Sequence, residues 1–430
     1  MARLLFTLWP YPTHIHPFIA LARELRERGH EICFYCGGEG IRLLEQQGFQ
    51  CMPFRDVDWS GVARTVEDLI AGRRRPIQVS LNWARFLAAT VPAQVRDLEG
   101  ILARWPADAI VCDIAMWAPI LVLHDRDRMP VIPFSHVANC ILPGPEGPVQ
   151  GLALPRRRGS LVELIAQAAS QVARLVTART RHRANTLRRS YGLPPLATGV
   201  NEFTGTMPLY LVPSSSEFDN ERRDLPPSVR YVGPCLWDKP QDQPAPAWLG
   251  EIPRDRPVVL VEEGSLYTNE PRVLRMAAQA LAGLPLSVQV VAGRGRQLDR
   301  LQLGPLAGNV ALRPHTPLSD LLPLASVLVT NGNSESVLAA LQAGVPTVVL
   351  PSIWDQAELA WRVSETGVGI RLSPWRSRPR HMRAAVERIL HDPAFRERTA
   401  TLQATLARCG GPAAAAQYVE EMLAGTGGDR

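Results

Sequence analysis

Short apolar runs that read as β-strands alternate with helical patterns in both halves of this chain, and this alternation limits the folds available to it. Near the N-terminus, residues 4–8 form one such run. Apolar residues then recur over 18–25 at the i, i+3, i+4 and i+7 positions of an amphipathic helix, which Gly29 ends. A second apolar run follows at 32–35. A strand, a helix and a strand in this order indicate a parallel, doubly wound α/β sheet.

A proline-rich segment separates two series of such runs. The further strands that we predict cover 109–113, 131–134, 209–212, 258–261, 288–291, 327–330 and 347–350. Prolines are frequent from 215 to 257, and a stretch such as 239–246 cannot hold a helix or a central strand. The predicted organisation is a first domain over 1–215, a linker over 216–257, a second domain over 258–405, and a helical segment over 406–430 that could pack back on the first domain.

The composition is that of a globular protein without a nucleic-acid partner. Of the 430 residues, 46% are hydrophobic and 20% are charged, which provides for a large core and argues against disorder. The net charge of +6 is spread along the chain, and no recognised nucleic-acid-binding motif accompanies it. Several of the seven cysteines sit in apolar runs, and neither a signal peptide nor an apolar stretch of about 20 residues is present. We therefore expect a soluble, cytoplasmic protein.

Two turns in the second half carry small polar side chains where strands end. A turn with Gly332 follows the run that ends at Thr330, and a helix then begins. Such a turn presents backbone N–H groups and the positive end of a helix dipole, which suit a phosphate. Asp355 and Gln356 follow the next strand and offer acceptors and donors for sugar hydroxyls. Each turn could equally be an ordinary helix cap, and the residues alone leave that alternative open.

Together these segments resemble the nucleotide-sugar glycosyltransferases of the GT-B fold, which include bacterial macrolide and plant secondary-metabolite enzymes. The matches to the C-terminal signature of that family are Thr330, Gly332, Ser336, Ala340-Leu341, Gly344-Val345-Pro346, Pro351 and Asp355-Gln356. The resemblance extends to Gly264-Ser265 and to Tyr231-Val232-Gly233-Pro234, so that it covers nearly the whole chain. It implies two facing Rossmann-like, doubly wound α/β domains with a cleft between them. The N-terminal domain would bind the acceptor and the C-terminal domain the nucleotide sugar.

The resemblance also implies roles on the donor side. The hydroxyl of Ser265 would meet the diphosphate, and His315, two residues before Pro317, would stack on the nucleotide base. The residues that would stabilise the leaving diphosphate are Asn331, Gly332, Asn333 and Ser336. Asp355 and Gln356 would select the sugar.

In the N-terminal half, the H-x-x-P motif of the family corresponds to His14-Ile15-His16-Pro17, in the loop after the first strand. By resemblance His14 is the general base, and Asp113, at the end of a later strand, holds its other ring nitrogen. A neutral imidazole can accept a proton from an attacking hydroxyl, and a carboxylate fixes its tautomer and stabilises the imidazolium. Taken singly, His14 could cap the following helix and Asp113 could cap its strand. His16 is a second candidate for the base, although it lacks the H-x-x-P spacing.

Three positions depart from the family pattern. Asn331 stands where the family has a histidine on the diphosphate, Ala339 where it has the glutamate that holds the ribose, and Glu335 where it has an asparagine. The family shows similar losses in members that use deoxysugars bound to thymidine. Since Glu335 lies one helical turn before Ala339, we hypothesise that its carboxylate replaces the missing ribose contact.

The sequence thus predicts an inverting glycosyltransferase that moves a hexose or deoxyhexose from a UDP-sugar or dTDP-sugar to a hydroxyl of a small, partly apolar natural-product acceptor. By resemblance it needs no metal and no other cofactor, and no metal-ligand cluster is visible. The alternative is a non-catalytic relative that keeps the fold as a binding or auxiliary protein, which the three departures would explain.

Arginine clusters at 73–75 and 156–158, together with arginines such as Arg188 on an expected helix over 160–191, leave two interpretations open. They could form a solvated surface, or make a weak membrane-surface contact that helps a lipophilic acceptor to arrive. The sequence leaves the oligomeric state open.

Overall fold

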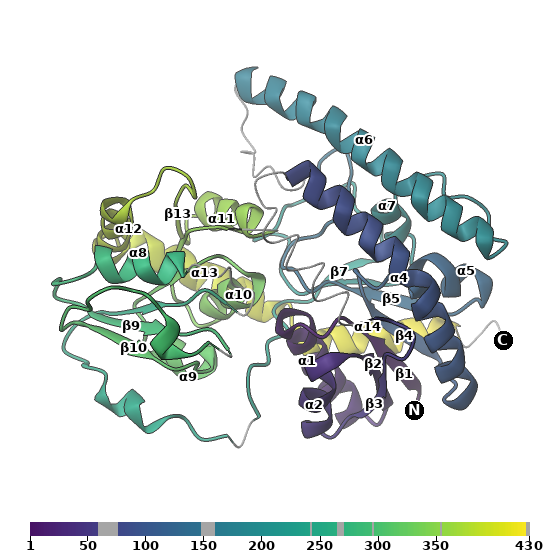
Figure 1. Ribbon diagram of the computed structural model, residues 1–430, viewed down its shortest axis with the longest axis horizontal. Helices are drawn as coiled ribbons and strands as arrows, with labels where there is room; N and C mark the ends of the chain where they lie inside the picture. The colour runs from purple at the N-terminus through teal and green to yellow at the C-terminus, as the bar shows by residue number, and fades with distance from the viewer. Residues whose placement is uncertain are drawn as a thin grey trace.

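The structure is a computed structural model that describes residues 1–58, 76–147, 160–240, 243–264, 271–294, 296–352 and 355–426, and two parallel sheets form the centres of two α/β domains (Figure 1). Ser265 and the arginine clusters at 73–75 and 156–158 lie outside the described residues. Within the described ranges, no helix combines the length and the apolar character that crossing a membrane requires.

The first domain is built on a seven-stranded sheet with the order β3-β2-β1-β4-β5-β6-β7, in which every neighbouring pair is parallel. Its strands are β1 (Arg3–Thr7), β2 (Glu31–Cys36), β3 (Gln50–Pro53), β4 (Ala109–Asp113), β5 (Val131–Phe134), β6 (Tyr210–Val212) and β7 (Val229–Tyr231). The strand order reverses between β1 and β4. Loops after the strands on either side of such a reversal leave room for a ligand beyond the carboxyl ends of the strands.

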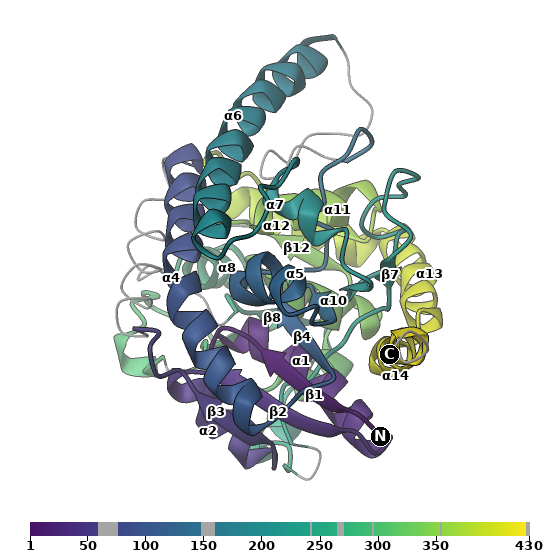
Figure 2. The same cartoon turned by 90° about the vertical axis from the view of Figure 1, so that its right-hand side faces the viewer.

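Helices cover both faces of this sheet. They are α1 (Pro12–Glu27), α2 (Gly38–Gln46), α4 (Pro76–Arg104), α5 (His124–Arg126), α6 (Ser160–Ser190), α7 (Val200–Thr204) and a π-helix, η1 (Pro119–Leu123). Because side chains alternate along a strand, Leu4 and Phe6 of β1 pack with α1 on one face, whereas Leu5 packs with α4 on the other. Figure 2 shows α4 and α6 running side by side, and the two helices are in contact.

The expected linker begins later than we predicted from the prolines. Within 216–257, β7 (Val229–Tyr231) pairs with β6 as the last strand of the first sheet. The physical reason is that the prolines around 226–227 and 234 flank β7 without interrupting it, and that β7 lies at the edge of the sheet, where a strand needs a partner on one side only. The connection to the second domain therefore starts only after β7, and Val232, which follows this strand, is still buried in the core of the first domain.

The second domain contains a six-stranded parallel sheet with the order β10-β9-β8-β11-β12-β13. Its strands are β8 (Val258–Val261), β9 (Ser287–Val291), β10 (Val310–Arg313), β11 (Val327–Thr330), β12 (Thr347–Val349) and β13 (Gly369–Arg371). Its helices are α8 (Arg272–Ala280), α9 (Leu318–Leu321), α10 (Ser334–Gln342), α11 (Gln356–Glu365), α12 (Pro379–His391) and α13 (Ala394–Arg408), with short 3-10 turns at Ala247–Glu251, Leu298–Arg300 and Leu322–Leu324. The expectation of two doubly wound domains is confirmed.

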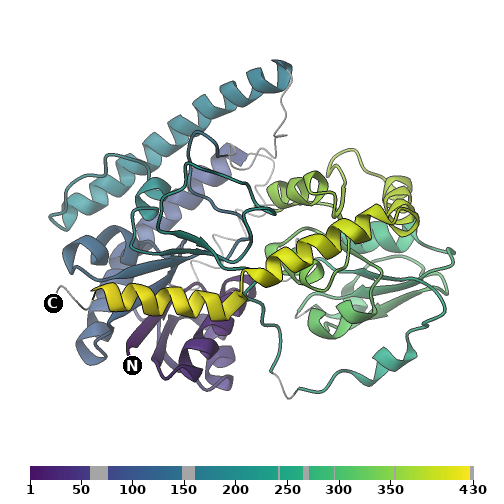
Figure 3. The same cartoon turned by 180° about the vertical axis from the view of Figure 1, so that it is seen from behind.

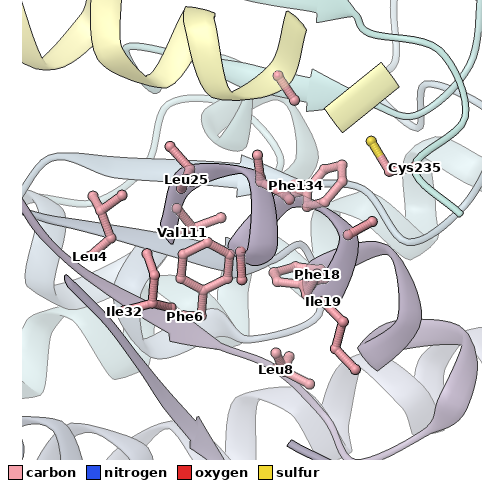
Figure 4. Close-up of a cluster of buried hydrophobic side chains, with 14 of the residues drawn as sticks. Leu4, Phe6, Leu8, Phe18, Ile19, Leu25, Ile32, Val111, Phe134 and Cys235 are labelled. Carbon is pink, nitrogen blue, oxygen red and sulfur yellow. The ribbon is translucent and has the colours of Figure 1, made fainter. Parts of the chain in front are cut away.

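The last helix, α14 (Gly411–Thr426), returns to the first domain, as Figure 3 shows. It contacts α1, and its residues Ala415, Ala416 and Val419 are buried in the same apolar cluster as Phe6. Figure 4 shows this cluster between the sheet and α14. The chain therefore passes between the domains twice, once at Gly233 and once at the junction of α13 and α14.

One predicted surface arginine is not on the surface. Arg188 of α6 is almost completely buried, and its guanidinium donates to the backbone oxygens of Leu121 and Pro194 and to the carboxylate of Asp125. Planar guanidinium groups with several donors are well suited to such multiple contacts. Arg188 therefore anchors α6 to the rest of the domain, and neither of the two surface interpretations applies to it.

Candidate functional site

His14 lies in the first turn of α1, directly after the loop that follows β1. The sequence placed it in a loop, but the helix begins at Pro12, because a proline at this position needs no hydrogen-bond partner and already has a helical φ angle. His14 is 8% exposed. The helix start therefore holds the imidazole in place beyond the carboxyl end of β1.

Asp113 is the last residue of β4, and it is completely buried. Because β4 is the neighbour of β1 at the point where the strand order reverses, its carboxylate reaches His14, and the Nδ1–H group of His14 donates to Oδ2. The other oxygen, Oδ1, accepts the backbone N–H of Ala115 at 2.8 Å. The structure thus brings together the two residues to which the resemblance assigned catalysis.

A third side chain, His136, completes this cluster, and the sequence analysis did not find it. Its Nδ1–H group donates to Oδ1 of Asp113 at 3.0 Å. Its ring stacks on that of His14 with 3.7 Å between the centroids and 24° between the planes. His136 follows β5, the neighbour of β4. The signal that could have found it is therefore a histidine two residues after a strand adjacent to the one that ends in Asp113.

The environment sets the protonation of the three groups. Burial lowers the pKa of His14 and outweighs the attraction of Asp113, and the nearby His136 lowers it further. Burial alone would raise the pKa of Asp113, but the two imidazoles together hold it well below its usual range. Burial alone would lower the pKa of His136, but Asp113 raises this pKa above the ordinary value. At neutral pH the cluster therefore contains an ionised Asp113 and a His14 that is ready to accept a proton.

The ligating atoms of His14, Asp113 and His136 lie within 4.8 Å of one another, a spacing that would also suit a metal ion. Both Nδ1 atoms, however, face an oxygen of Asp113 at hydrogen-bond distance. Each contact is therefore occupied by a proton in this arrangement. The absence of a metal requirement stays a prediction.

The turn between β11 and α10 is a helix cap in which the side chains bind one another. Asn333 is the N-cap residue of α10: its carbonyl oxygen accepts the backbone N–H of Ser336 at 3.0 Å, and its amide donates to the hydroxyl of Ser336 at 2.7 Å. Asn331 is buried, and its amide donates to the backbone oxygen of Glu263. Gly332 has a φ of +85°, and a Cβ there would overlap the side chain of Val349.

These contacts change the expected roles in the turn. The polar hydrogens of Asn333 and Ser336 are directed into the protein, since the Ser336 hydroxyl also binds Glu262. Within the described residues, by contrast, the backbone N–H groups of Ser334 and Glu335 have no acceptor. Free N–H groups in the first turn of a helix favour an anion. The backbone of α10, rather than the side chains of its cap, is thus the better candidate for binding a phosphate.

Two buried glutamates beside this turn escaped the sequence analysis. Glu262 and Glu263 follow β8 directly, and burial raises the pKa of both carboxyl groups. Glu262 accepts from the hydroxyl of Thr330 and from the backbone N–H of Gly264. Glu263 pairs with Arg296 at 2.8 Å. Glu262 thus links the loop after β8 to the end of β11, and Glu263 links it to the segment after β9.

Asp355 and Gln356 stand where α11 begins. Asp355 is at the N-cap position, but its side chain makes no capping bond and instead accepts the hydroxyl of Ser334 at 3.0 Å. The same Ser334 oxygen accepts the backbone N–H of Ala138 from the first domain at 3.0 Å. Gln356 is buried, and its carbonyl oxygen accepts the N–H and hydroxyl groups of Ser352. Asp355 is therefore tied to the loop that carries His136, and Gln356 supports the loop before α11.

Glu335 and His16 join the two domains. The Nδ1–H group of His16 donates to Oε1 of Glu335 at 2.6 Å. His315, the expected base-stacking residue, keeps an exposed side chain, although the surrounding protein and the charge of Arg294 lower its pKa to about 4. Its uncharged ring suits stacking on a base. The charge of Glu335 acts on His315, so the three side chains belong to one region of the interface between the domains.

We expect Glu335→Ala to weaken binding of a nucleoside diphosphate about tenfold, because losing one hydrogen bond to a charged acceptor costs about 1.4 kcal/mol or more. The matched variant His16→Ala removes the same interdomain bond but keeps the carboxylate that we predict to contact the ribose. It should change the Kd less than threefold, as measured by isothermal titration. Equal losses in both variants would show that the pair only holds the domains together and that Glu335 does not bind the ribose.

Known proteins resemble this chain in sequence. Residues 288–422 match the family described as Erythromycin biosynthesis protein CIII-like, C-terminal domain. The chain is 33% identical over 408 residues to 4'-demethylrebeccamycin synthase from Lentzea aerocolonigenes, a match that covers 94% of this chain and 95% of that protein.

Solved structures agree in fold. The calicheamicin glycosyltransferase CalG4 superimposes with a TM-score of 0.73 and 26% identity, and 99% of each chain is covered. The spinosyn rhamnosyltransferase SpnG complexed with thymidine diphosphate has a TM-score of 0.73 and 19% identity, over 98% of this chain and all of the other. The second likeness concerns the fold alone. The architecture, the matched segment and the similarity over nearly the full length agree with one another.

Proposed function

The chain belongs to the GT-B-fold glycosyltransferases of natural-product pathways, which act on nucleotide sugars, and we propose that it transfers a hexose or deoxyhexose to a hydroxyl of a small, partly apolar acceptor with inversion at the anomeric carbon. The observation that carries this proposal is the contact between His14 and Asp113 beyond the carboxyl ends of β1 and β4.

In the proposed reaction, His14 acts through its Nε2 atom. A carboxylate only accepts hydrogen bonds, so Nδ1 of His14 carries the proton that faces Asp113, and Nε2 of the neutral ring has a free lone pair. Nε2 takes the proton of the acceptor hydroxyl as the oxygen forms a bond to the anomeric carbon. The bond from that carbon to the diphosphate breaks, and the diphosphate leaves with the electron pair. A single displacement of this kind inverts the configuration.

The leaving diphosphate is stabilised from the second domain. The N–H groups of Ser334 and Glu335 at the start of α10 are suitable donors, and the helix dipole adds to their effect. Asp355, held by Ser334, would accept hydroxyls of the sugar. His315 would stack on the base, and Ser265 would contact the diphosphate. The proposed partners are thus a nucleotide sugar and a small acceptor, and the seven free cysteines are consistent with the reducing conditions of the cytoplasm.

A thermal-shift screen of nucleotides tests the donor part of the proposal. A ligand that binds only the native state at 100 times its Kd stabilises that state by about 2.7 kcal/mol, so we expect UDP or dTDP to raise the Tm by several degrees. The corresponding monophosphates are matched ligands that lack the β-phosphate, and they should raise the Tm less.

Transfer is then assayed with the best sugar nucleotide and a panel of phenols and polyketide alcohols, with and without EDTA. We expect turnover in both conditions, and the configuration of the product can be read from its anomeric coupling constants. If diphosphates bind but wild type turns over no better than its His14→Ala variant, the chain is a non-catalytic relative. If no nucleotide shifts the Tm, the donor assignment is wrong.

A further inference from the structure

His136 has no role in the reaction as described so far, although it makes the closest ring contact of the cluster. It lies two residues after β5, and its ring covers one face of the His14 ring at 3.7 Å. The two histidines bind different oxygens of the same carboxylate. Asp113 also accepts the N–H of Ala115, so it is fixed from three directions.

We propose that His136 is a positioning residue of the transfer reaction, which shares Asp113 with His14 and keeps the stacked His14 ring in its proton-accepting form. The inference rests on the proposed function, because it concerns the base of that reaction. Its first part is geometric. A ring held parallel to His14 by the same carboxylate restricts rotation of His14 about its own side-chain bonds, so that Nε2 keeps its direction.

The second part is electrostatic. One carboxylate lies between two imidazoles, and its single negative charge favours a positive charge on one of the two rings. Because Asp113 raises the pKa of His136 while burial lowers that of His14, the first proton that the pair takes up goes to His136. That charge opposes protonation of the stacked His14 ring. His14 therefore stays neutral to lower pH than it would beside Asp113 alone.

The other charged and titratable groups around the pair support this distribution. Asp355 of the second domain acts on His136 and favours its charged form. Ala138, from the same loop, donates its N–H to Ser334, which in turn binds Asp355. The centroid of the Tyr11 ring lies 5.7 Å from that of the His14 ring. Burial raises the pKa of the Cys36 thiol at the end of β2, and Asp113 adds to that effect, so this thiol is uncharged.

Two variants separate the geometric and the electrostatic parts. His136→Asn can still donate an N–H to Asp113 but loses the ring and the charge, whereas His136→Phe keeps a stacked ring and loses the donor and the charge. In both, removing the charge raises the pKa of His14, so the acidic limb of kcat/KM should move to higher pH by about one unit. At the optimum, kcat should fall about tenfold in His136→Phe and less in His136→Asn, because the amide retains the contact with Asp113.

The titration of His14 itself provides a readout that needs neither the nucleotide sugar nor the acceptor molecule. In protein labelled with 13C-histidine, the His14 signal is identified by its loss in His14→Ala. We expect its midpoint to rise in both His136 variants. If the midpoint rises but no sugar is transferred by wild type, the proposed function fails and the coupling of the two rings stands.

If transfer occurs and neither the His14 midpoint nor the acidic limb moves, the inference about His136 is wrong. A loss of kcat with an unchanged acidic limb would show that His136 only supports the loop after β5. The same conclusion applies if both variants are unfolded at the assay temperature by circular dichroism. Each outcome therefore decides for or against a role in setting the pH range of the base.

Discussion

Replacing His14 with alanine should lower kcat for sugar transfer by about 10³-fold, because the acceptor hydroxyl then loses the group that takes its proton. His14 is the imidazole whose Nδ1 is held by Asp113, so its Nε2 is the nitrogen left for the substrate. Binding of the nucleoside diphosphate should change less than twofold, since the donor groups come from the second domain. Steady-state kinetics and isothermal titration of the same preparation measure the two effects separately.

Two other histidines make this experiment specific. His182 lies exposed on α6, so His182→Ala is the matched control and should keep wild-type kcat. His16 is the competing candidate for the base, but its Nδ1 is bound to Glu335 rather than to a buried aspartate of the same domain. The result that would contradict this assignment is a loss of about 10³-fold in kcat for His16→Ala together with nearly wild-type activity for His14→Ala. The base would then have to be reassigned to His16.

The second large effect is expected for Asp113→Asn. The aspartate accepts from both imidazoles and from the N–H of Ala115, whereas an asparagine has one acceptor oxygen and presents an NH₂ group to one of the rings. The ring that meets the NH₂ group must turn its unprotonated nitrogen toward it. If that ring is His14, its proton moves to Nε2, and it can no longer accept one from the substrate. We expect kcat to fall about 10³-fold.

Asp113→Asn should also destabilise the protein at neutral pH. His14 and His136 hold the pKa of Asp113 below that of an unfolded chain, so the ionised carboxylate stabilises the fold above the unfolded value. This contribution is lost as the pH falls through the folded pKa. Removing one partner of a buried charged cluster costs about 3 kcal/mol, which urea unfolding at pH 7 can measure.

Asp108→Asn is the matched control for this variant. Asp108 precedes the same strand at its opposite end, is exposed, and accepts the backbone N–H of Arg3. It should leave kcat within threefold of wild type and lower the free energy of unfolding by less than about 1 kcal/mol. If Asp113→Asn behaves like this control in kcat, Asp113 does not determine the tautomer of the base.

The sequence could predict the central strands of both sheets because they are buried on two sides. Val327–Thr330 and Ala109–Asp113 are completely buried, and such strands appear as continuous apolar runs. The strands that it missed, such as Gln50–Pro53 and Val310–Arg313, are mostly half-buried or exposed. They lie at the edges of the sheets, where mixed composition hides them.

The residues of the candidate site also fall into those that the sequence could predict and those that it could not. His14 and Asp113 stand in motifs that follow central strands, so the resemblance could find them. His136 has no such motif, and its place depends on β5 lying beside β4 and on the stacking of two rings, neither of which a linear pattern contains. The side chains of Asn333 and Ser336 can both donate hydrogen bonds, but only the structure shows that they bind each other and that Ser336 also binds Glu262.

The two passages of the chain between the domains lie next to each other. A Cβ at Gly233 would come within 2.8 Å of the backbone oxygen of Leu406, and the N–H of Gly411 donates to the backbone oxygen of Val232 at 2.6 Å. With both connections gathered at one place, we expect any relative motion of the two domains to be a rotation about that place. The separation of His14 from the start of α10 would then change by a rotation about this place. A pair of spin labels, one on each side of the interface, would report that rotation as a change in the distance between the labels.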